Sequence, residues 1–141
     1  MPTLQLKISP PRDAATCDRL ARQLTDITAA TLGKRADVTA VMIEELPAGR
    51  WYVGAAPVQC PTAWLEISIT AGTNTVAQKS AFIEAAFGAL EDLLESAQGP
   101  TGSAGLEPAS YIIVREVPAT DWGYGGQTQA ARRLKNDKKR R

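Results

Sequence analysis

Hydrophobic and polar residues alternate along the first stretch of the chain. Leu4, Leu6 and Ile8 are apolar, and the residues between them are polar. In an extended segment, this spacing places all three apolar side chains on one face. Pro10 and Pro11 follow, and proline cannot continue a strand because it has no backbone N–H group to donate. The pattern therefore predicts a β-strand that begins near the amino terminus and ends before Pro10.

The next segment has a helical period. Between Ala14 and Leu32, apolar or small residues recur every three or four positions, as they do on one face of a helix; they are Cys17, Leu20, Ala21, Leu24, Ile27 and Thr31. Asp13 precedes the segment, and its carboxylate can accept a hydrogen bond from a free N–H group of the first turn. Gly33 suits the end of the helix. We predict a helix from about Ala14 to Leu32.

A second strand and a turn complete the first half of the chain. The strand is predicted from Asp37 to Glu45, with Val38, Val41, Met42 and Ile43 as its apolar residues. Residues 47–49 contain proline and glycine and predict a turn, and residues 50–53 predict a short extended piece.

The same order then starts again. A third strand is predicted around Trp64–Ile69, and a helix from about Val76 to Ser96. The predicted buried stripe of this helix consists of Ile83, Ala86, Phe87, Leu90, Leu93 and Leu94. Residues 98–109 are rich in glycine and proline and predict a loop. A fourth strand is predicted at Tyr111–Val114.

Two short motifs recur at one separation. Glu45-Leu-Pro-Ala48 resembles Glu116-Val-Pro-Ala119, and Trp51 corresponds to Trp122; both pairs are 71 residues apart (116 − 45 and 122 − 51). We interpret this echo as a tandem β-α-β duplication with a loop inserted in the second copy.

The duplication predicts an α+β fold in one domain, residues 1–141. Its units are residues 2–57 and 62–128, followed by a basic C-terminal tail at 129–141. Two such units give a four-stranded sheet with two helices on one face. The other face retains apolar residues, and oligomerisation is the simplest way to cover it.

Composition and charge argue against several classes of partner and of catalytic site. The net charge is +1, no apolar run is long enough to span a membrane, and no secretory signal is visible, so we expect neither a nucleic-acid nor a membrane partner. The basic tail is interpreted as a solvated, disordered end. The chain has no His and two Cys, which argues against a zinc site or a Ser-His-Asp triad. The thiols are expected to be reduced, in the cytoplasm.

The amino terminus offers a different kind of base. Pro2 follows Met1, and a small residue at that position normally permits removal of the initiator methionine. A terminal proline is a secondary amine, whereas an internal one is an amide without basicity. An ordinary α-amino group titrates near ~7.7–8.0, and burial lowers its pKa. Pro2 could therefore act as a general base near neutral pH, although proline is also a common second residue.

These residues resemble the 4-oxalocrotonate tautomerase group of the tautomerase superfamily, in a fused form with two copies in one chain. Pro2 matches the catalytic proline of that family, and Arg12 matches an arginine that binds a substrate carboxylate. Trp51 matches an aromatic residue of a hairpin that walls the active site, and the segment 121–126 resembles the aromatic-Gly-x-Gly-Gly hairpin of the family.

The resemblance implies a cofactor-independent isomerase that forms a homotrimer and binds no metal. Its substrate would be a small anion, such as a 2-hydroxymuconate-like enol or keto acid. Pro2 would be the catalytic base and Arg12 would hold the anionic group. Trp51 and Trp122 would exclude water, and Tyr111 would hydrogen-bond a developing enolate. Packing alone could also explain both tryptophans and Tyr111, and Arg12 could be a surface charge.

Two departures from the family pattern leave alternatives open. Ala40 stands where the family has a second arginine, and Thr73 stands where the second copy would repeat Arg12. The second copy starts near Ala63, in mid-chain, and has no free amine. Whether Arg12 faces Pro2 or this second site is left open. The alternatives are a hydratase, dehalogenase or decarboxylase that uses protonated Pro2, and a non-catalytic trimeric scaffold.

Overall fold

A computed structural model describes residues 1–94 and 105–141 of the chain. Its helices are α1 (Ala14–Leu32), a single 3₁₀ turn η1 (Ala36–Val38), α2 (Val76–Leu94) and α3 (Gln129–Arg140). Its strands are β1 (Thr3–Ser9), β2 (Ala40–Glu45), β3 (Tyr52–Val53), β4 (Ala56–Pro57), β5 (Thr62–Thr70), β6 (Tyr111–Val117), β7 (Gly123–Tyr124) and β8 (Gln127–Thr128). No described helix is both long and apolar enough to cross a membrane.

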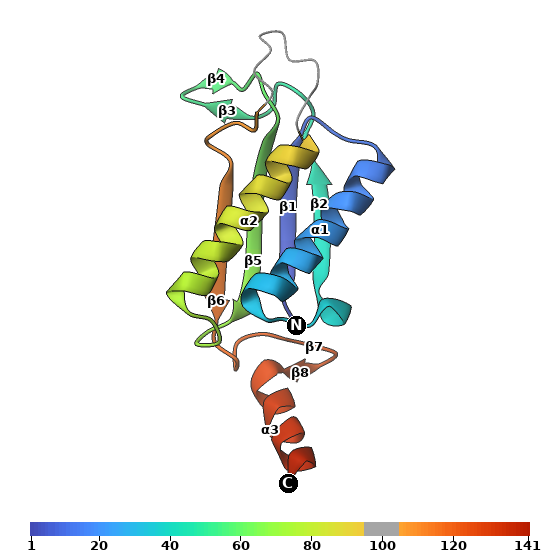
Figure 1. Ribbon diagram of the computed structural model, residues 1–141, viewed down its shortest axis with the longest axis vertical. Helices are drawn as coiled ribbons and strands as arrows, with labels where there is room; N and C mark the ends of the chain where they lie inside the picture. Colours follow the sequence, from blue (N-terminus) through green and yellow to red (C-terminus); the bar gives the residue numbers. More distant parts are fainter. Residues whose placement is uncertain (95–104) are drawn as a thin grey trace.

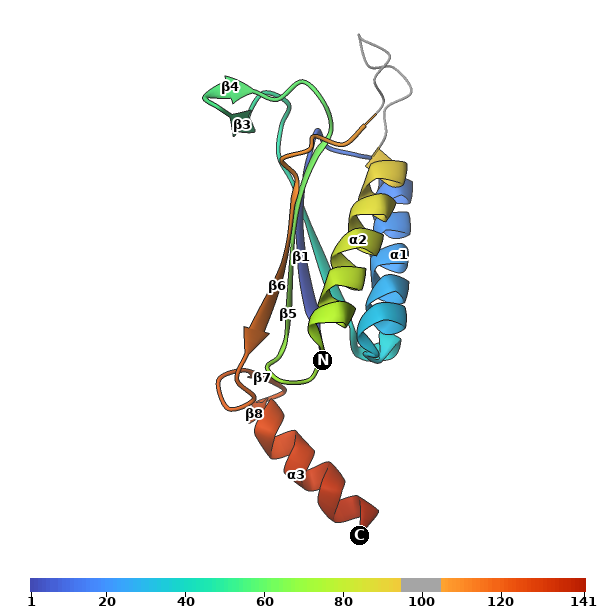
Figure 2. The ribbon, with the colours of Figure 1, turned by 60° about the vertical axis from the view of Figure 1, so that its left-hand side comes forward.

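Four of the strands form one sheet in the order β2-β1-β5-β6 (Figure 1). β1 pairs in parallel with β2, β5 pairs in parallel with β6, and the two central strands β1 and β5 are antiparallel. Helices α1 and α2 cover the same face of the sheet, which is clearest in the rotated view of Figure 2. The predicted α+β fold, with four strands and two helices on one face, is confirmed.

The alternation in the first strand builds the core. Leu4, Leu6 and Ile8 are at most 1% exposed, and Leu20 and Leu24 of α1 are fully buried in the same cluster. Burying a side chain of this size stabilises the fold by roughly 1.5–3 kcal/mol. The core therefore lies between the sheet and the two helices.

The limits of α1 are as predicted. The Asp13 carboxylate accepts a hydrogen bond from the Thr16 backbone N–H at 2.9 Å. Gly33 ends the helix with a φ of 66°, and its N–H donates to the Ala29 carbonyl at 3.1 Å. A residue with a side chain would be strained in this left-handed conformation.

Two details of the predicted elements are wrong. The second strand begins at Ala40 rather than Asp37, because residues 36–38 form η1, closed by a bond from the Thr39 N–H to the Ala36 carbonyl at 3.2 Å. In α2 the buried stripe starts at Phe82, which is fully buried, whereas Ile83 is 40% exposed. Both residues fit helical spacing with Ala86, so the pattern alone could not choose between them. The predicted end of this helix at residues 95 and 96, and much of the predicted loop, lie outside the described residues.

The basic C-terminal segment is a helix, not the disordered end that we predicted. Helix α3 begins at Gln129, and the Thr128 hydroxyl caps it by accepting from the Ala131 N–H at 3.0 Å. The Gln129 N–H also donates to the Trp122 carbonyl at 3.0 Å, which fastens the helix to the hairpin before it. From there α3 projects away from the sheet (Figure 2).

Candidate active site

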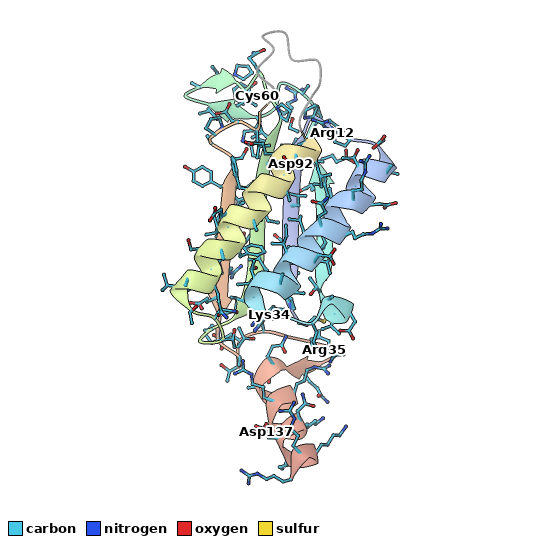
Figure 3. The ribbon with its side chains drawn as sticks, viewed as in Figure 1. Arg12, Lys34, Arg35, Cys60, Asp92 and Asp137 are labelled. Carbon is cyan, nitrogen blue, oxygen red and sulfur yellow. The ribbon has the colours of Figure 1, made fainter. Side chains whose placement is uncertain are left out.

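The residues predicted for the site lie at two opposite ends of the sheet. Pro2 precedes β1, and Arg12 lies beyond its far end. A strand of seven residues spans roughly 20 Å. Figure 3 shows Arg12 near the start of α1 and Lys34 at the opposite end, where Figure 1 marks the amino terminus. Arg12 and Pro2 of one chain therefore do not share a site.

A cavity of about 140 Å³ lies at the Pro2 end. It is lined by Met1, Pro2, Lys34, Ile69, Thr70, Thr73, Trp122, Gln129 and Arg133. Pro2 is buried, and its carbonyl accepts a hydrogen bond from the Ala40 N–H at 3.1 Å. The cavity thus brings together Pro2 and Trp122, two of the five predicted site residues.

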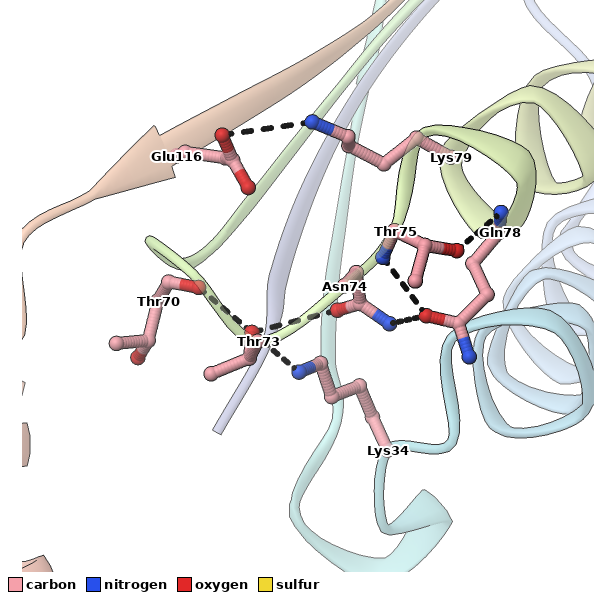
Figure 4. Close-up of polar contacts among 8 residues, drawn as sticks. All are labelled: Lys34, Thr70, Thr73, Asn74, Thr75, Gln78, Lys79 and Glu116. Atoms are coloured by element: carbon pink, nitrogen blue, oxygen red, sulfur yellow. Dashed lines mark hydrogen bonds and ion pairs between the residues drawn. The ribbon is translucent and has the colours of Figure 1, made fainter.

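One side of this cavity is a chain of hydrogen bonds between the end of α1 and the loop before α2 (Figure 4). The Lys34 ammonium donates to the Thr73 hydroxyl at 2.9 Å, and that hydroxyl donates to the Thr70 carbonyl at 2.6 Å. Asn74 donates its side-chain amide to the Leu32 carbonyl at 2.8 Å, which joins the two segments again. Lys34 is therefore held in place, and its partner there is a neutral hydroxyl.

Trp122 forms another wall. Its indole N–H donates to the Thr70 hydroxyl at 3.2 Å, and its carbonyl accepts from the Gln129 N–H. The side chain is therefore held at the end of β5, and the backbone of the same residue is held at the first residue of α3. Gln129 itself is only 8% exposed.

Helix α3 is oriented by Arg132. Its guanidinium lies 3.7 Å from the centre of the Tyr124 ring and donates to the Tyr124 carbonyl at 2.7 Å. A cation stacked on an aromatic face is attracted by the electrons of the ring. Arg133, the next residue, lines the cavity instead. Arg132 therefore holds the helix on the β7–β8 hairpin, while Arg133 contributes its charge to the site.

The electrostatics of the cavity disfavour a protonated amine. The pKa of the Met1 amino group is lowered, first by burial and then by four cationic side chains, Lys34, Arg132, Arg133 and Arg35. Burial, and secondly Arg133, also lowers the pKa of Lys34. Burial is the larger cause of both pKa shifts. The gathered positive charge adds to it, because the lining of the cavity contains no acidic residue.

The other three predicted site residues lie at the far end of the same chain. Arg12 donates through Nη2 to the Leu94 carbonyl at 2.7 Å. Trp51 precedes the β3–β4 hairpin, which lies at that end of the sheet (Figure 1). Tyr111 begins β6 opposite Trp64 and is 63% exposed. None of the three meets the cavity around Pro2 within this chain.

Sequence analysis missed Lys34 and Arg133 as site residues. Lys34 follows the predicted helix end at Gly33, and Arg133 belongs to the basic tail, so neither position suggested a site. The available signal was the charge itself, because both are cationic residues in segments that flank a hairpin or a helix end. The place of Arg133 beside the same cavity as Pro2 depends on the path of the chain after β6, which no local pattern reveals.

Neither cysteine offers an alternative nucleophile. Burial raises the pKa of Cys17, and burial together with a hydrogen bond to Glu107 at 3.2 Å raises that of Cys60. Both thiols therefore stay protonated at neutral pH more than a free cysteine does. In residues 1–94 and 105–141, no three side chains of the metal-binding types gather.

No protein-family model matches the sequence, and a search of curated proteins finds no match. Solved structures do match. A native fused 4-oxalocrotonate tautomerase is 27% identical, with a TM-score of 0.72 over 92% of this chain and 97% of that chain. Another fused 4-oxalocrotonate tautomerase, solved as a symmetric trimer, is 23% identical, with a TM-score of 0.74 over 92% of this chain and 98% of that chain.

A third solved structure adds a chemical observation on a different protein. It is 18% identical to this chain, with a TM-score of 0.74 over 92% of this chain and 98% of that chain, and it was crystallised as inactivated by 2-oxo-3-pentynoate. Together these structures show that the chain has the fold of the fused 4-oxalocrotonate tautomerases.

Proposed function

We propose that this chain is a tautomerase that uses Pro2, freed by removal of Met1, as a general base on a small enol or keto acid. The observation that carries the proposal is the cavity at Pro2, where burial and neighbouring cations lower the pKa of the amino group of Met1. Removing Met1, which is 38% exposed, would move that amine onto the buried residue next to it. The fold of fused tautomerases supports the same function.

The reaction is a proton transfer with no net change in atoms. The neutral secondary amine of Pro2 would take the proton of an enol or of a carbon next to a carbonyl, and would become a secondary ammonium. It would then return a proton to another carbon of the same conjugated system. The nearby cations favour the neutral amine, so they suit a base better than an acid. Trp122 would limit the access of water.

We propose further that the chain assembles as a homotrimer. The sheet face opposite the helices carries Met42, Tyr111 and Ile113, which are at least 36% exposed. A structural counterpart of this fold is a trimer. In such an assembly Arg12, Trp51 and Tyr111 could reach a Pro2 only from a neighbouring copy. Light scattering after size exclusion would test this, and a monomeric mass would refute it.

The function is tested by intact mass and turnover together. Purified protein is weighed before and after treatment with 2-oxo-3-pentynoate, which inactivates a protein of the same fold. Tautomerisation of phenylenolpyruvate and of 2-hydroxymuconate is measured for the wild type and for Pro2→Ala. We expect loss of Met1, one adduct on Pro2, and turnover that falls at least about 100-fold in the variant, the usual lower bound for general-base catalysis.

Two results would refute the proposal. One is a retained Met1, because Pro2 would then be an amide without a basic nitrogen. The other is a free Pro2 that neither reacts nor supports turnover, which would favour a trimeric scaffold. Hydration or decarboxylation of a small acid without tautomerisation would instead favour protonated Pro2 as an acid.

A further inference from the structure

We propose that Lys34 and Arg133 together form the anion-binding site of the cavity, so that helix α3 is part of the active site. This inference deepens the proposed function and rests on it for the chemistry at Pro2. The substrate class that follows is a small monocarboxylate, with its reacting carbons between the cation pair and Pro2.

The first argument is the balance of charge. Lys34 and Arg133 both line the cavity, and no carboxylate does. Within the described part of the chain, the ion pairs are formed by other residues, and neither Lys34 nor Arg133 takes part in one. Lys34 is half-buried and Arg133 is exposed. Two cations that line one cavity repel each other, and a bound anion would relieve the repulsion. The cavity is thus complementary to negative charge.

The second argument is the geometry of the donors. Lys34 already donates to the Thr73 hydroxyl, which orients the ammonium and leaves two of its three protons for a ligand. The guanidinium of Arg133 is planar and can bind both oxygens of a carboxylate. A cavity of about 140 Å³ holds the volume of only a few water molecules. A carboxylate bound by this pair would therefore lie close to Pro2.

The third argument is that α3 is positioned rather than loose at its start. The Thr128 cap, the Gln129 N–H bond to Trp122 and the Arg132 contact with Tyr124 all act on its first turn. Two adjacent residues of α3 make different contacts: Arg132 binds the hairpin, and Arg133 lines the cavity. Arg132 is thus a positioning residue for the anion site.

The test uses benzoate as the probe and benzamide as its uncharged match in shape. Each is titrated into the full-length ¹⁵N-labelled protein at low salt, and the indole N–H signal of Trp122 reports binding at this cavity. We expect benzamide to bind at least about 10-fold more weakly than benzoate, since a hydrogen bond to a charged group contributes about 1.5–3 kcal/mol. Lys34→Gln and Arg133→Gln should each lower the affinity for benzoate by a similar factor.

Matched controls lie on the same helix. Arg140→Gln makes the same change seven residues further along α3, and Lys138→Gln matches the lysine change. Neither Arg140 nor Lys138 lines the cavity. Both should bind benzoate as the wild type does. Arg133→Lys keeps the charge and should recover part of the affinity, which separates lost charge from lost folding. Dispersed amide spectra confirm that each variant is folded.

The outcomes separate this inference from the proposed function. Benzoate needs no proton transfer, so its binding by Lys34 and Arg133 would stand even if Pro2 proved inactive. Conversely, turnover that depends on Pro2 but is unchanged in KM by Arg133→Gln would overturn the anion site and leave the tautomerase intact. Equal binding of benzoate and benzamide, or benzoate affinity unchanged in Arg133→Gln, would also overturn it.

Discussion

The link between the β7–β8 hairpin and helix α3 can be tested with two neighbouring glycines. Gly125 and Gly126 have φ angles of 60° and 77°. Alanine at either position would be placed in a left-handed conformation, which costs roughly 1–2 kcal/mol. A Cβ atom on Gly126 would meet nothing within 4 Å, whereas one on Gly125 would lie 2.7 Å from the guanidinium of Arg132. Only Gly125→Ala must therefore displace Arg132.

The expected difference follows from what Arg132 would lose. The end of a long side chain can move away at small steric cost, so the loss is its stacking on Tyr124 and its hydrogen bond to that carbonyl. Stacking at an exposed site contributes about 0.5–1 kcal/mol and a hydrogen bond about 0.5–1.5 kcal/mol. Gly125→Ala should therefore weaken the attachment of α3 by about 1–2 kcal/mol more than Gly126→Ala does.

Hydrogen exchange measured by mass spectrometry reads this difference locally. A loss of 1–2 kcal/mol raises the open population about 5- to 30-fold, so amides of 129–141 should exchange faster by that factor in Gly125→Ala than in Gly126→Ala. Arg132→Gln should reproduce the effect without the backbone strain. Equal exchange in the two alanine variants, with Arg132→Gln like the wild type, would show that the guanidinium does not hold the helix.

Three further outcomes are expected. The kcat/KM for tautomerisation should rise with pH as the Pro2 amine loses its proton, with a midpoint below the ordinary α-amino pKa. Lys34→Gln should move this midpoint to higher pH, because it removes a positive charge that lowers the pKa of the amine. A midpoint that is the same in the variant and the wild type would contradict this. Phe82→Ala should lower the free energy of unfolding, measured with urea, by about 3–5 kcal/mol. Ile83→Ala truncates a side chain that is 40% exposed and should lower it by less than about 1 kcal/mol. Trp122→Phe removes the hydrogen bond to the Thr70 hydroxyl and should cost about 1 kcal/mol, also by urea unfolding, whereas a stability equal to the wild type would show the bond to be neutral.

The fold could be predicted from sequence where local patterns carried enough signal. The alternation of Leu4, Leu6 and Ile8 fixed which face of the first strand is buried, and Asp13 and Gly33 marked both ends of the first helix. These features depend on neighbours a few residues away, so composition and spacing suffice to read them.

The site could not be predicted in the same way, because it depends on which chain ends meet. Arg12 lies one strand length from Pro2, so a match to a family motif says nothing about whether the two share a cavity in one chain. Arg133 lines the same cavity as Pro2 because the β7–β8 hairpin turns the chain back across the end of β5. Pro2 and Arg133 are 131 positions apart in the sequence (133 − 2), and a periodic pattern of apolar residues carries no information on so distant a pair.

The residue near the start of β5 shows how the two halves of the chain can evolve differently. Ala63 stands there where Pro2 stands at the head of β1, and its backbone N–H donates to the Ser110 hydroxyl at 3.0 Å. If the two halves arose by the duplication inferred from the sequence, they have therefore diverged at this position, with Pro2 in the first half and Ala63 in the second. Two identical separate subunits must share every mutation, so a change that suits one end of the sheet is imposed on the other. A single fused chain can instead vary the Ala63 end for packing alone, while selection for the proposed activity acts on the Pro2 end.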